Sequence, residues 1–584
     1  MAFLAAGEVV LRLSRGHRSV MRGPAFLLSV QVHVERAQCR ELACPHRSRL
    51  HGGTVSANRR MYLRPSVVAQ PLLHRWYAWP YLLAPHTGAL NLRDRLLPIV
   101  QAYLMAPHMH ESVLSDPSRY GGPFLNPEGA GVEQVKELLD AMLSGGSAKL
   151  QLAEDIDQLR ALLKEKAAGG SMEPLYAQVP ESLRGRVELV YDTAHRPSFR
   201  FFESLMYRSQ AFEREAQTMT LSAAPAAQPF VYGSPVLPGP HRLDVPVPFD
   251  SPLWDEFFAA RLAPVDVEAL AERLDVTDLD AFTALFQADA PEPYEKAAPD
   301  TVRVRYFNHA TVLIETENTA VLLDPLIGYD GDGHEHFTIA DLPPFIDAVV
   351  ISHFHSDHFS LETLLQLRSR VGVILVPRAS GGSLADPSLK TMLQALGFER
   401  VQELGELESH SIAERVEVTA LPFIGEHADL DIRTKIVPMV RALGRSFMFA
   451  TDITPVEPAL YDNIADVIGR LDALFIGLEC VGAPLKWLYG PLLDEPLSRQ
   501  HNAERRLKGS DAAMADRLAA QLGAEHVYAY AMGLEPWLKH LTGSEYEADA
   551  EPVQQAALLA ELTARRGVTA ELLYRQAERS WPAA

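Results

Sequence analysis

One stretch constrains this chain more than any other: a short apolar run followed at once by a cluster of metal-binding residue types. Val349, Val350 and Ile351 are apolar enough for a buried strand, and residues 352–358 then read Ser-His-Phe-His-Ser-Asp-His. Folds that alternate strands and helices carry their functional groups where strands leave the sheet. Histidine and aspartate side chains are common metal ligands. The pattern therefore predicts a metal site at the end of a buried strand.

The spacing of the four ligand-type residues, His353, His355, Asp357 and His358, favours two metal ions over one. The first two histidines can converge from an extended segment. Asp357 and His358 are consecutive, so their side chains do not easily join that pair around a single ion. One ion held by the two histidines and a second held by the Asp-His pair satisfy the spacing better.

Strand-like runs alternate with helical patterns from residue 299 to residue 584. The runs typical of strands are 301–316, 319–326, 347–352, 371–377, 416–423, 445–452, 472–480 and 526–532, and residues 361–372 have a helical pattern. This alternation predicts an α/β domain in which helices are layered over sheet.

Residues 61–298 have mainly helical patterns and predict a separate N-terminal domain. Apolar residues recur at helical spacing in 132–143 and again in 152–163, and the glycine pair 145–146 predicts a turn between two antiparallel helices. Residues 286–301, rich in Pro, Ala and charge, are typical of an interdomain linker.

Residues 1–60 differ in composition from the rest of the chain. They contain ten Arg, no Lys and three Glu, a net charge of +7, whereas the whole chain has a net charge of −21. They lack the apolar segment and cleavage site of a signal peptide. We expect a disordered basic extension upstream of a true start at Met61, whose removal leaves fold and activity unchanged.

The acidic balance of the chain argues against a protein built around nucleic-acid phosphates. No apolar run approaches the roughly 18 residues that a membrane-spanning helix needs. The three cysteines, Cys39, Cys44 and Cys480, are too few for a disulfide framework. These features predict a cytoplasmic protein that binds neither nucleic acid nor membrane.

The residues at 353–358 match the motif HxHxDH, and with them the chain resembles the metallo-β-lactamase superfamily over roughly residues 302–545. The resemblance implies an αββα sandwich for the C-terminal domain. Asp324 is similar to an early strand-end aspartate of that superfamily, and Asp452, at the end of a later strand, to its bridging metal ligand. A helix N-cap is the alternative role for Asp452.

The superfamily's last histidine has no obvious counterpart in this chain. His526 begins the expected final strand at the end remote from the site, whereas Glu535 and His540 follow its other end. We take His540 as the candidate ligand. An open metal position is the alternative.

Glu426 and His427 stand where the superfamily supplies a further histidine, and the choice between them separates two chemistries. A histidine ligand would give the nitrogen-rich site of a zinc hydrolase. Glu426 would place three carboxylates around the two metals, which favours iron. We favour Glu426.

This glutamate, its 26-residue spacing to Asp452 and the long helical N-terminal domain make the chain similar to the diiron β-hydroxylases of chloramphenicol and related nonribosomal peptide biosynthesis. The resemblance implies two irons, with Glu426 and Asp452 as the ligands given a catalytic role, and hydroxylation of an aminoacyl thioester on a carrier protein. It also implies a separate electron donor and a homodimer formed through the N-terminal domain. The alternatives are a free small-molecule substrate and a dinuclear zinc hydrolase of an ester, thioester or phosphodiester.

Four further residues follow a later expected strand: Glu479, Cys480, Trp487 and Tyr489. We expect them to contact the substrate or support the metal ligands. Packing at a sheet edge is the alternative.

Overall fold

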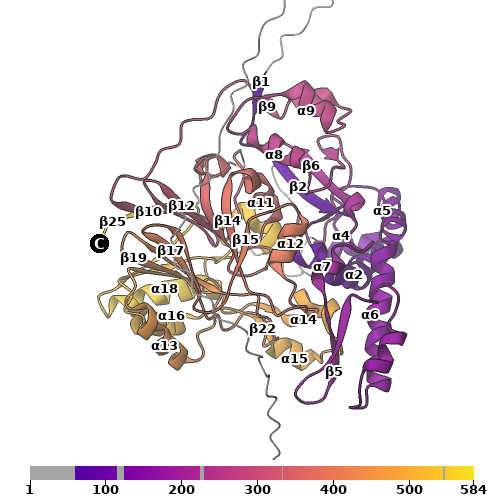
Figure 1. Ribbon diagram of the computed structural model, residues 1–584. Helices are drawn as coiled ribbons and strands as arrows, with labels where there is room; N and C mark the ends of the chain where they lie inside the picture. Colours follow the sequence, from indigo (N-terminus) through magenta and orange to yellow (C-terminus); the bar gives the residue numbers. More distant parts are fainter. Residues whose placement is uncertain (1–59, 115–123, 224–228, 332, 544–545) are drawn as a thin grey trace, which may run out of the picture. The chain divides into compact units, whose positions relative to one another are not determined.

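Two seven-stranded sheets form the centre of the computed structural model (Figure 1). Across the first sheet the order is β15 (Val401–Leu404), β14 (Val371–Pro377), β13 (Ile346–Val350), β12 (Thr319–Leu323), β11 (Thr311–Thr316), β10 (Thr301–Asn308) and β25 (Ala577–Pro582). Across the second it is β16 (Ser409–Ala413), β17 (Val416–Leu421), β18 (Val437–Ala442), β19 (Arg445–Phe449), β20 (Ala473–Ile476), β23 (His526–Ala529) and β24 (Thr569–Leu572). The structure describes residues 60–114, 124–223, 229–331, 333–543 and 546–584.

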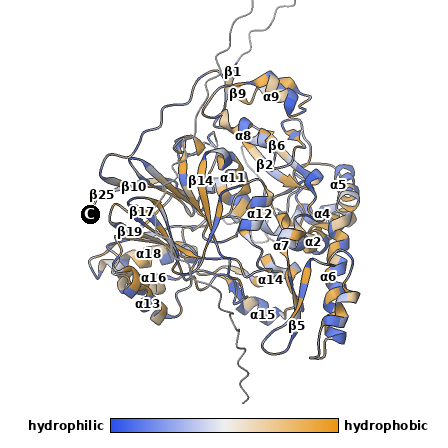
Figure 2. Cartoon of the chain, in the orientation of Figure 1, coloured by the Kyte–Doolittle hydropathy of each residue, from blue (hydrophilic) through white to orange (hydrophobic). Residues whose placement is uncertain are grey.

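Side chains that alternate along the strands fill the space between the two sheets. Val302 and Val304 of β10 share one buried cluster with Val416 and Val418 of β17. The intervening side chains point to the outer faces, as the two-residue period of a strand requires. Strands such as β14, apolar along most of their length (Figure 2), are therefore covered on both faces.

Helices cover both outer faces. On the first sheet lie α11 (Leu361–Leu367) and α12 (Leu389–Ala395), and on the second α13 (Pro458–Ile468), α16 (Ala512–Gln521) and α18 (Glu551–Ala564). The order of layers is helix, sheet, sheet, helix. This arrangement confirms the predicted αββα sandwich.

The N-terminal region is rich in helix, as predicted. It contains α1 (Pro80–Leu83), α2 (Pro85–Asn91), α3 (Leu97–Met105), α4 (Pro107–Leu114), α5 (Val132–Gly145), α6 (Ser147–Lys166), α7 (Glu203–Met206), α8 (Pro252–Ala259), α9 (Val267–Arg273) and α10 (Leu279–Thr283). It also contains a four-stranded sheet of β3 (Trp76–Tyr77), β2 (Val68–Leu73), β6 (Gln217–Ser222) and β7 (Leu243–Val245). The helical patterns did not anticipate this sheet, because its strands are short and have no strict alternation.

The predicted turn between two long helices lies at Gly146, between α5 and α6. A Cβ atom on this residue would lie 2.5 Å from the Met142 carbonyl oxygen and 2.7 Å from a methyl carbon of Leu92. Only glycine fits that gap without a shift of the neighbours. The close contact explains why the sequence has glycine there.

The N-terminal region packs directly on the helix layer of the first sheet. The guanidinium of Arg261 donates to Gln366 Oε1 at 2.8 and 3.1 Å, and Arg368 lies 2.8 Å from Asp255. The aromatic residues of the stretch 74–85, including Trp76 and Tyr81, are buried in the shared core.

The predicted basic extension lies outside the described residues, apart from Arg60, which begins β1 (Arg60–Leu63). In the described ranges, no helix combines the length and apolar character needed to cross a membrane.

Candidate metal centre

Strand direction brings the predicted ligands to one edge of the sandwich. In the first sheet β10, β12 and β13 run the same way, and in the second β17 and β19 do. The segments that follow these strands carry His309, Asp324, residues 352–358, Glu426 and Asp452. Ligand-type residues far apart in sequence therefore meet at one end of the fold.

The backbone at this edge is strained. The residues His309, Asp324, Glu426, Thr451 and Ala531 have φ between 32° and 62°, although none of them is glycine. Such conformations are uncommon outside glycine and persist only where the surrounding structure holds them. The strain is concentrated where the side chains converge.

Three residues form the first metal-binding group: His353, His355 and Glu426. Their ligand atoms lie within 4.8 Å of one another. His353 Nε2 lies 3.1 Å from Glu426 Oε2, and His355 Nδ1 contacts the other oxygen of the same carboxylate. All three side chains are buried. Glu426 is therefore placed to share an ion with the histidine pair.

Asp452 lies between the first group and a second one. Its Oδ2 is 3.6 Å from His353 Nε2 and 2.9 Å from His358 Nε2, and the three residues form a group within 4.8 Å. Asp357 Oδ2 is 4.0 Å from His358 Nε2. The alternative role for Asp452 does not hold, because α13 begins at Pro458 and its cap is Glu457.

The site residues pass a simple test for metal binding. Six buried atoms around the centre form no hydrogen bond: His309 Nε2, His353 Nε2, His358 Nε2, Glu426 Oε2, His427 Nε2 and Asp452 Oδ1. A buried polar atom without a partner destabilises a fold by about 1–3 kcal/mol. Five of these atoms, all except His427 Nε2, belong to residues of the metal-binding groups, and metal ions bound there would explain them.

Asp324 fixes two of the histidines in the tautomer that a metal requires. Its Oδ1 accepts from Ser352 N and its Oδ2 from Ser352 Oγ, each at 2.6 Å. Asp324 Oδ2 lies 3.0 Å from His358 Nδ1, and Ser352 Oγ lies 3.0 Å from His353 Nδ1. Because the Ser352 hydroxyl donates to Asp324, its oxygen accepts from His353 Nδ1 while Asp324 accepts from His358 Nδ1. Both rings then carry their proton on Nδ1, which leaves Nε2 free to bind a metal.

Tyr489 contacts the rings of both His355 and His427, of which only His355 belongs to a metal-binding group of the described residues. Its hydroxyl lies 3.2 Å from His355 Nε2 and 2.7 Å from His427 Nδ1. If His355 binds metal through Nδ1, its Nε2 donates to Tyr489, which in turn donates to His427 Nδ1. The neutral His427 ring then carries its proton on Nε2, the nitrogen nearer the centre. Burial lowers the pKa of His427 well below its usual value, which keeps the ring neutral. This order of hydrogen bonds favours Glu426 over His427.

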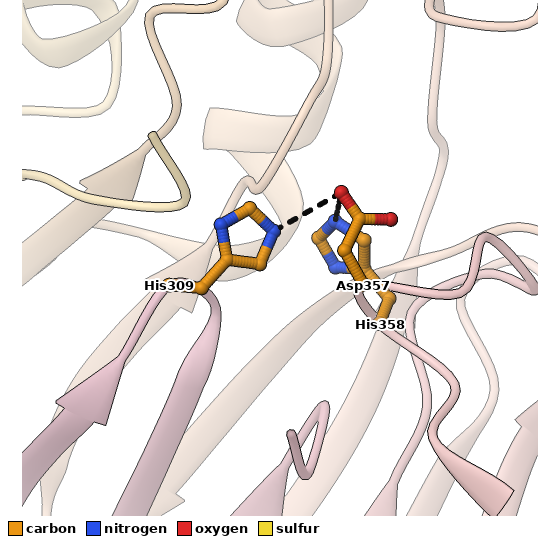
Figure 3. A group of neighbouring side chains, drawn as sticks. All are labelled: His309, Asp357 and His358. Atoms are coloured by element: carbon orange, nitrogen blue, oxygen red, sulfur yellow. Dashed lines mark ion pairs between the residues drawn. The ribbon is translucent and has the colours of Figure 1, made fainter. Parts of the chain in front are cut away.

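His309 also faces the centre, although the sequence motif does not include it. It lies at the tip of the β10–β11 turn, beside Asp357 and His358 (Figure 3), and the three form a metal-binding group. Its Nδ1 accepts from the backbone N–H of Gly533 at 3.1 Å. The neutral ring therefore has its proton on Nε2, which lies 3.3 Å from Asp357 Oδ2. His309 is close enough to the centre to bind metal, but its hydrogen bond from Gly533 favours a ring whose Nε2–H donates to Asp357.

The structure does not bring His540 to the centre. It lies in α17 (Lys539–Thr542), where its Nδ1 is 2.9 Å from the Trp537 carbonyl oxygen, and it belongs to none of the metal-binding groups of the described residues. Glu535 accepts a hydrogen bond from Tyr306. The loop after β23 leaves His540 and Glu535 outside the metal-binding groups of the described residues, which local spacing alone does not show.

A cavity of about 550 Å³ opens onto the metal-binding side chains. Aromatic side chains from three distant segments form one wall: Trp79, Phe230, Tyr232 and Trp487. Glu479 also lines the cavity, and Tyr489 is buried behind it. The cavity is large enough for a small-molecule group to reach the ligands.

Two family models match the chain. The diiron non-heme β-hydroxylase N-terminal domain matches residues 62–290, and the β-lactamase superfamily domain matches residues 319–485. The 4-amino-L-phenylalanyl-[CmlP-peptidyl-carrier-protein] 3-hydroxylase of Streptomyces venezuelae is 36% identical over 532 residues, which are 88% of this chain and 98% of that protein. The chain belongs to the diiron β-hydroxylase family.

Solved structures of the family agree with the fold. The crystal structure of CmlA, a diiron β-hydroxylase from Streptomyces venezuelae, has a TM-score of 0.83 at 34% identity and covers 90% of this chain and 100% of its own. A mutant of CmlA has a TM-score of 0.80 at 35% identity and covers 89% of this chain. Membership of the diiron β-hydroxylase family makes this protein a dinuclear metalloenzyme. The zinc-hydrolase alternative is not supported.

One residue near the centre of this β-hydroxylase was missing from the sequence analysis, and the contacts of two others were not foreseen. His309 has no motif around it, and only the direction of β10 brings it to the edge. Asp324 was noted for its position, but its hydrogen bonds to two segments were not foreseen. Tyr489 was expected to contact the substrate or support the ligands, but its contacts with both His355 and His427 were not foreseen.

Proposed function

We propose that this enzyme hydroxylates the β-carbon of an aminoacyl group carried as a thioester on a carrier protein. One observation carries the proposal: the chain is 36% identical to a hydroxylase named for a peptidyl-carrier-protein substrate, and the match covers 98% of that hydroxylase. The cavity that opens onto the ligands supplies a place for the aminoacyl group. A free small-molecule substrate is the alternative.

Six residues are proposed as the ligands. His353, His355 and Glu426 would hold one iron, and Asp357 and His358 the other, with Asp452 as the bridge between them. Three carboxylates among six ligands give the site oxygen-rich character, which suits iron better than zinc. The two metal-binding groups that share His353 support the assignment of Asp452.

Iron bound at these residues would supply the reduction of O2 that inserts one oxygen atom into a C–H bond and releases the other as water. The reaction also consumes two electrons and two protons. We therefore propose a separate reductase as the electron donor.

The chain's own residues prepare the site for this chemistry. Asp324 and Tyr489 hold three histidine rings in fixed orientations, which keeps the binding nitrogens directed at the centre. Four aromatic side chains of the cavity wall, Trp79, Phe230, Tyr232 and Trp487, exclude water from the part of the cavity next to the ligands. His309 holds a proton on the nitrogen that faces Asp357.

Two further predictions accompany the function. We propose that the N-terminal region forms a homodimer, which its exposed apolar side chains Met105 and Met109 would support. The cytoplasmic location stays a prediction from cysteine content.

The test combines metal analysis with a product assay. Full-length protein purified from iron-supplied cells should contain about two irons per chain and show visible absorption from the ferric pair. With a reductant and O2 it should add one oxygen atom to an aminoacyl group on a carrier protein, as measured by mass spectrometry of the released amino acid. A colourless protein with two zincs that hydrolyses the thioester would refute the proposal.

A further inference from the structure

Glu479 is a cavity carboxylate that the metal-binding groups do not use. It follows β20 after two residues, and it lines the same cavity as Asp357, Glu426 and Asp452. It belongs to none of the metal-binding groups found among the described residues. A charged side chain in a largely apolar cavity next to an active site needs a specific explanation.

The partners of Glu479 leave its charge uncompensated. The hydroxyl of Tyr546 lies 2.7 Å from each carboxylate oxygen. Arg506 lines the same cavity, but its guanidinium donates to the carbonyl oxygens of Val481 and Gly482. Within the described ranges, no basic side chain forms an ion pair with this carboxylate. One neutral hydroxyl is a weak partner for a buried carboxylate.

The surroundings also disfavour an isolated negative charge. Burial is the main cause that raises the pKa of Glu479 to about 8, although the hydrogen bond from Tyr546 opposes this change. A cation bound beside the carboxylate would stabilise its ionised form. Without a cation the Glu479 carboxyl therefore keeps its proton near neutral pH, whereas a bound cation would favour the carboxylate.

We propose that Glu479 binds a primary ammonium group of the aminoacyl substrate. This inference rests on the proposed function and names the group that the cavity recognises. An ammonium ion is compact and has three donors, so it can bond to the carboxylate and still contact the aromatic wall.

Binding at this position would also select the carbon that reacts. In an aminoacyl group the α-nitrogen is separated from the β-carbon by the α-carbon alone. A carboxylate that fixes the ammonium therefore fixes the β-carbon relative to the metal ligands, which line the same cavity. An amine on the substrate's side chain is the second possible source of the ammonium, and the probes below distinguish the two.

Four pantetheine thioesters test the inference. The acyl groups are phenylalanyl, with an α-amine only; 3-(4-aminophenyl)propionyl, with an amine on the ring only; 4-aminophenylalanyl, with both; and 3-phenylpropionyl, with neither. The two probes with a ring amine are also prepared with a 4-(aminomethyl) group in its place, because an aniline is neutral near pH 7 whereas an aminomethyl group is protonated. Binding to the full-length protein is measured by quenching of tryptophan fluorescence, since Trp79 and Trp487 line the cavity.

The expected result is that an amine strengthens binding by about 10–100-fold, the range for a hydrogen-bonded charge pair. Glu479→Gln should remove this preference and leave the affinity for 3-phenylpropionyl pantetheine unchanged. Glu551→Gln, which removes a carboxylate from an exposed position on the same cavity, is the matched control and should keep the preference. Whichever single-amine probe gains affinity identifies the source of the ammonium.

Two outcomes would overturn the inference. One is a wild-type protein that binds the amine-free probe as tightly as the others. The other is a Glu479→Gln variant that weakens all probes equally, which a structural role would produce. Because binding is measured without turnover, a protein that discriminates amines but forms no hydroxylated product would refute the proposed function and leave the ammonium site standing.

Discussion

Replacement of Glu426 and of His427, one at a time, tests the ligand assignment most directly. Glu426 contacts His353 and His355, and its carboxylate belongs to their metal-binding group. His427 lies next to it in sequence, but its Nδ1 is engaged by Tyr489 at 2.7 Å and its Nε2 is 3.6 Å from Glu426. Glu426→Ala should therefore lose a metal, whereas His427→Ala should keep both.

The expected difference follows from the number of ligands. A four-ligand structural zinc site is worth about 10–16 kcal/mol, so one direct ligand contributes about 3–4 kcal/mol, which is about 100- to 1000-fold in affinity. A residue that only supports a ligand changes metal affinity by about 10- to 100-fold. His427 reaches the group through Tyr489, so its replacement belongs in the second range.

The assay is a chelator titration of iron-loaded protein, with bound metal measured at each step. Wild type and His427→Ala should retain two metals at a chelator concentration at which Glu426→Ala retains one. Circular dichroism of each variant shows whether the fold is intact. The assignment is refuted if His427→Ala releases a metal while Glu426→Ala holds two.

Three other predictions concern the same fold. His309→Ala and His540→Ala should each keep two metals in metal analysis after dialysis. Metal affinity should fall by less than about 100-fold in His309→Ala and should not change in His540→Ala. One metal per chain in His309→Ala would show that His309 is a ligand. Tyr489→Phe removes the hydroxyl that orients His355 and should weaken metal binding by about 10- to 100-fold without loss of the fold; unchanged affinity would contradict that role. Burial raises the pKa of Glu362 from 4.5 to about 7 in the folded protein. Between these pH values Glu362 ionises in the unfolded chain but stays protonated in the folded protein, so the free energy of unfolding falls as pH rises. Glu362→Gln should raise the melting temperature more at pH 8 than at pH 5. Equal shifts in melting temperature at the two pH values would show that Glu362 does not cause the pH dependence.

The local sequence was sufficient for those parts of the protein that depend on neighbours in the chain. The run at 349–351 predicted a buried strand, and β13 (Ile346–Val350) ends where the histidine cluster begins. The helical spacing of residues 132–163 predicted two helices joined at glycine. Strand periodicity predicted an α/β domain, and the resemblance carried by the dense motif implied the sandwich; both depend on side chains a few residues apart.

Only the tertiary structure decided which distant residues join the cluster. His309 precedes the motif by more than forty residues, and it reaches Asp357 because β10 runs in the same direction as β13. His540 has a suitable place in the sequence, but the loop after β23 holds it elsewhere. The identity of a metal ligand depends on where each nitrogen points and on which nitrogen holds a proton. Hydrogen bonds from other segments of the chain set both, so the sequence alone predicted a two-metal centre and the fold decided which side chains converge on it.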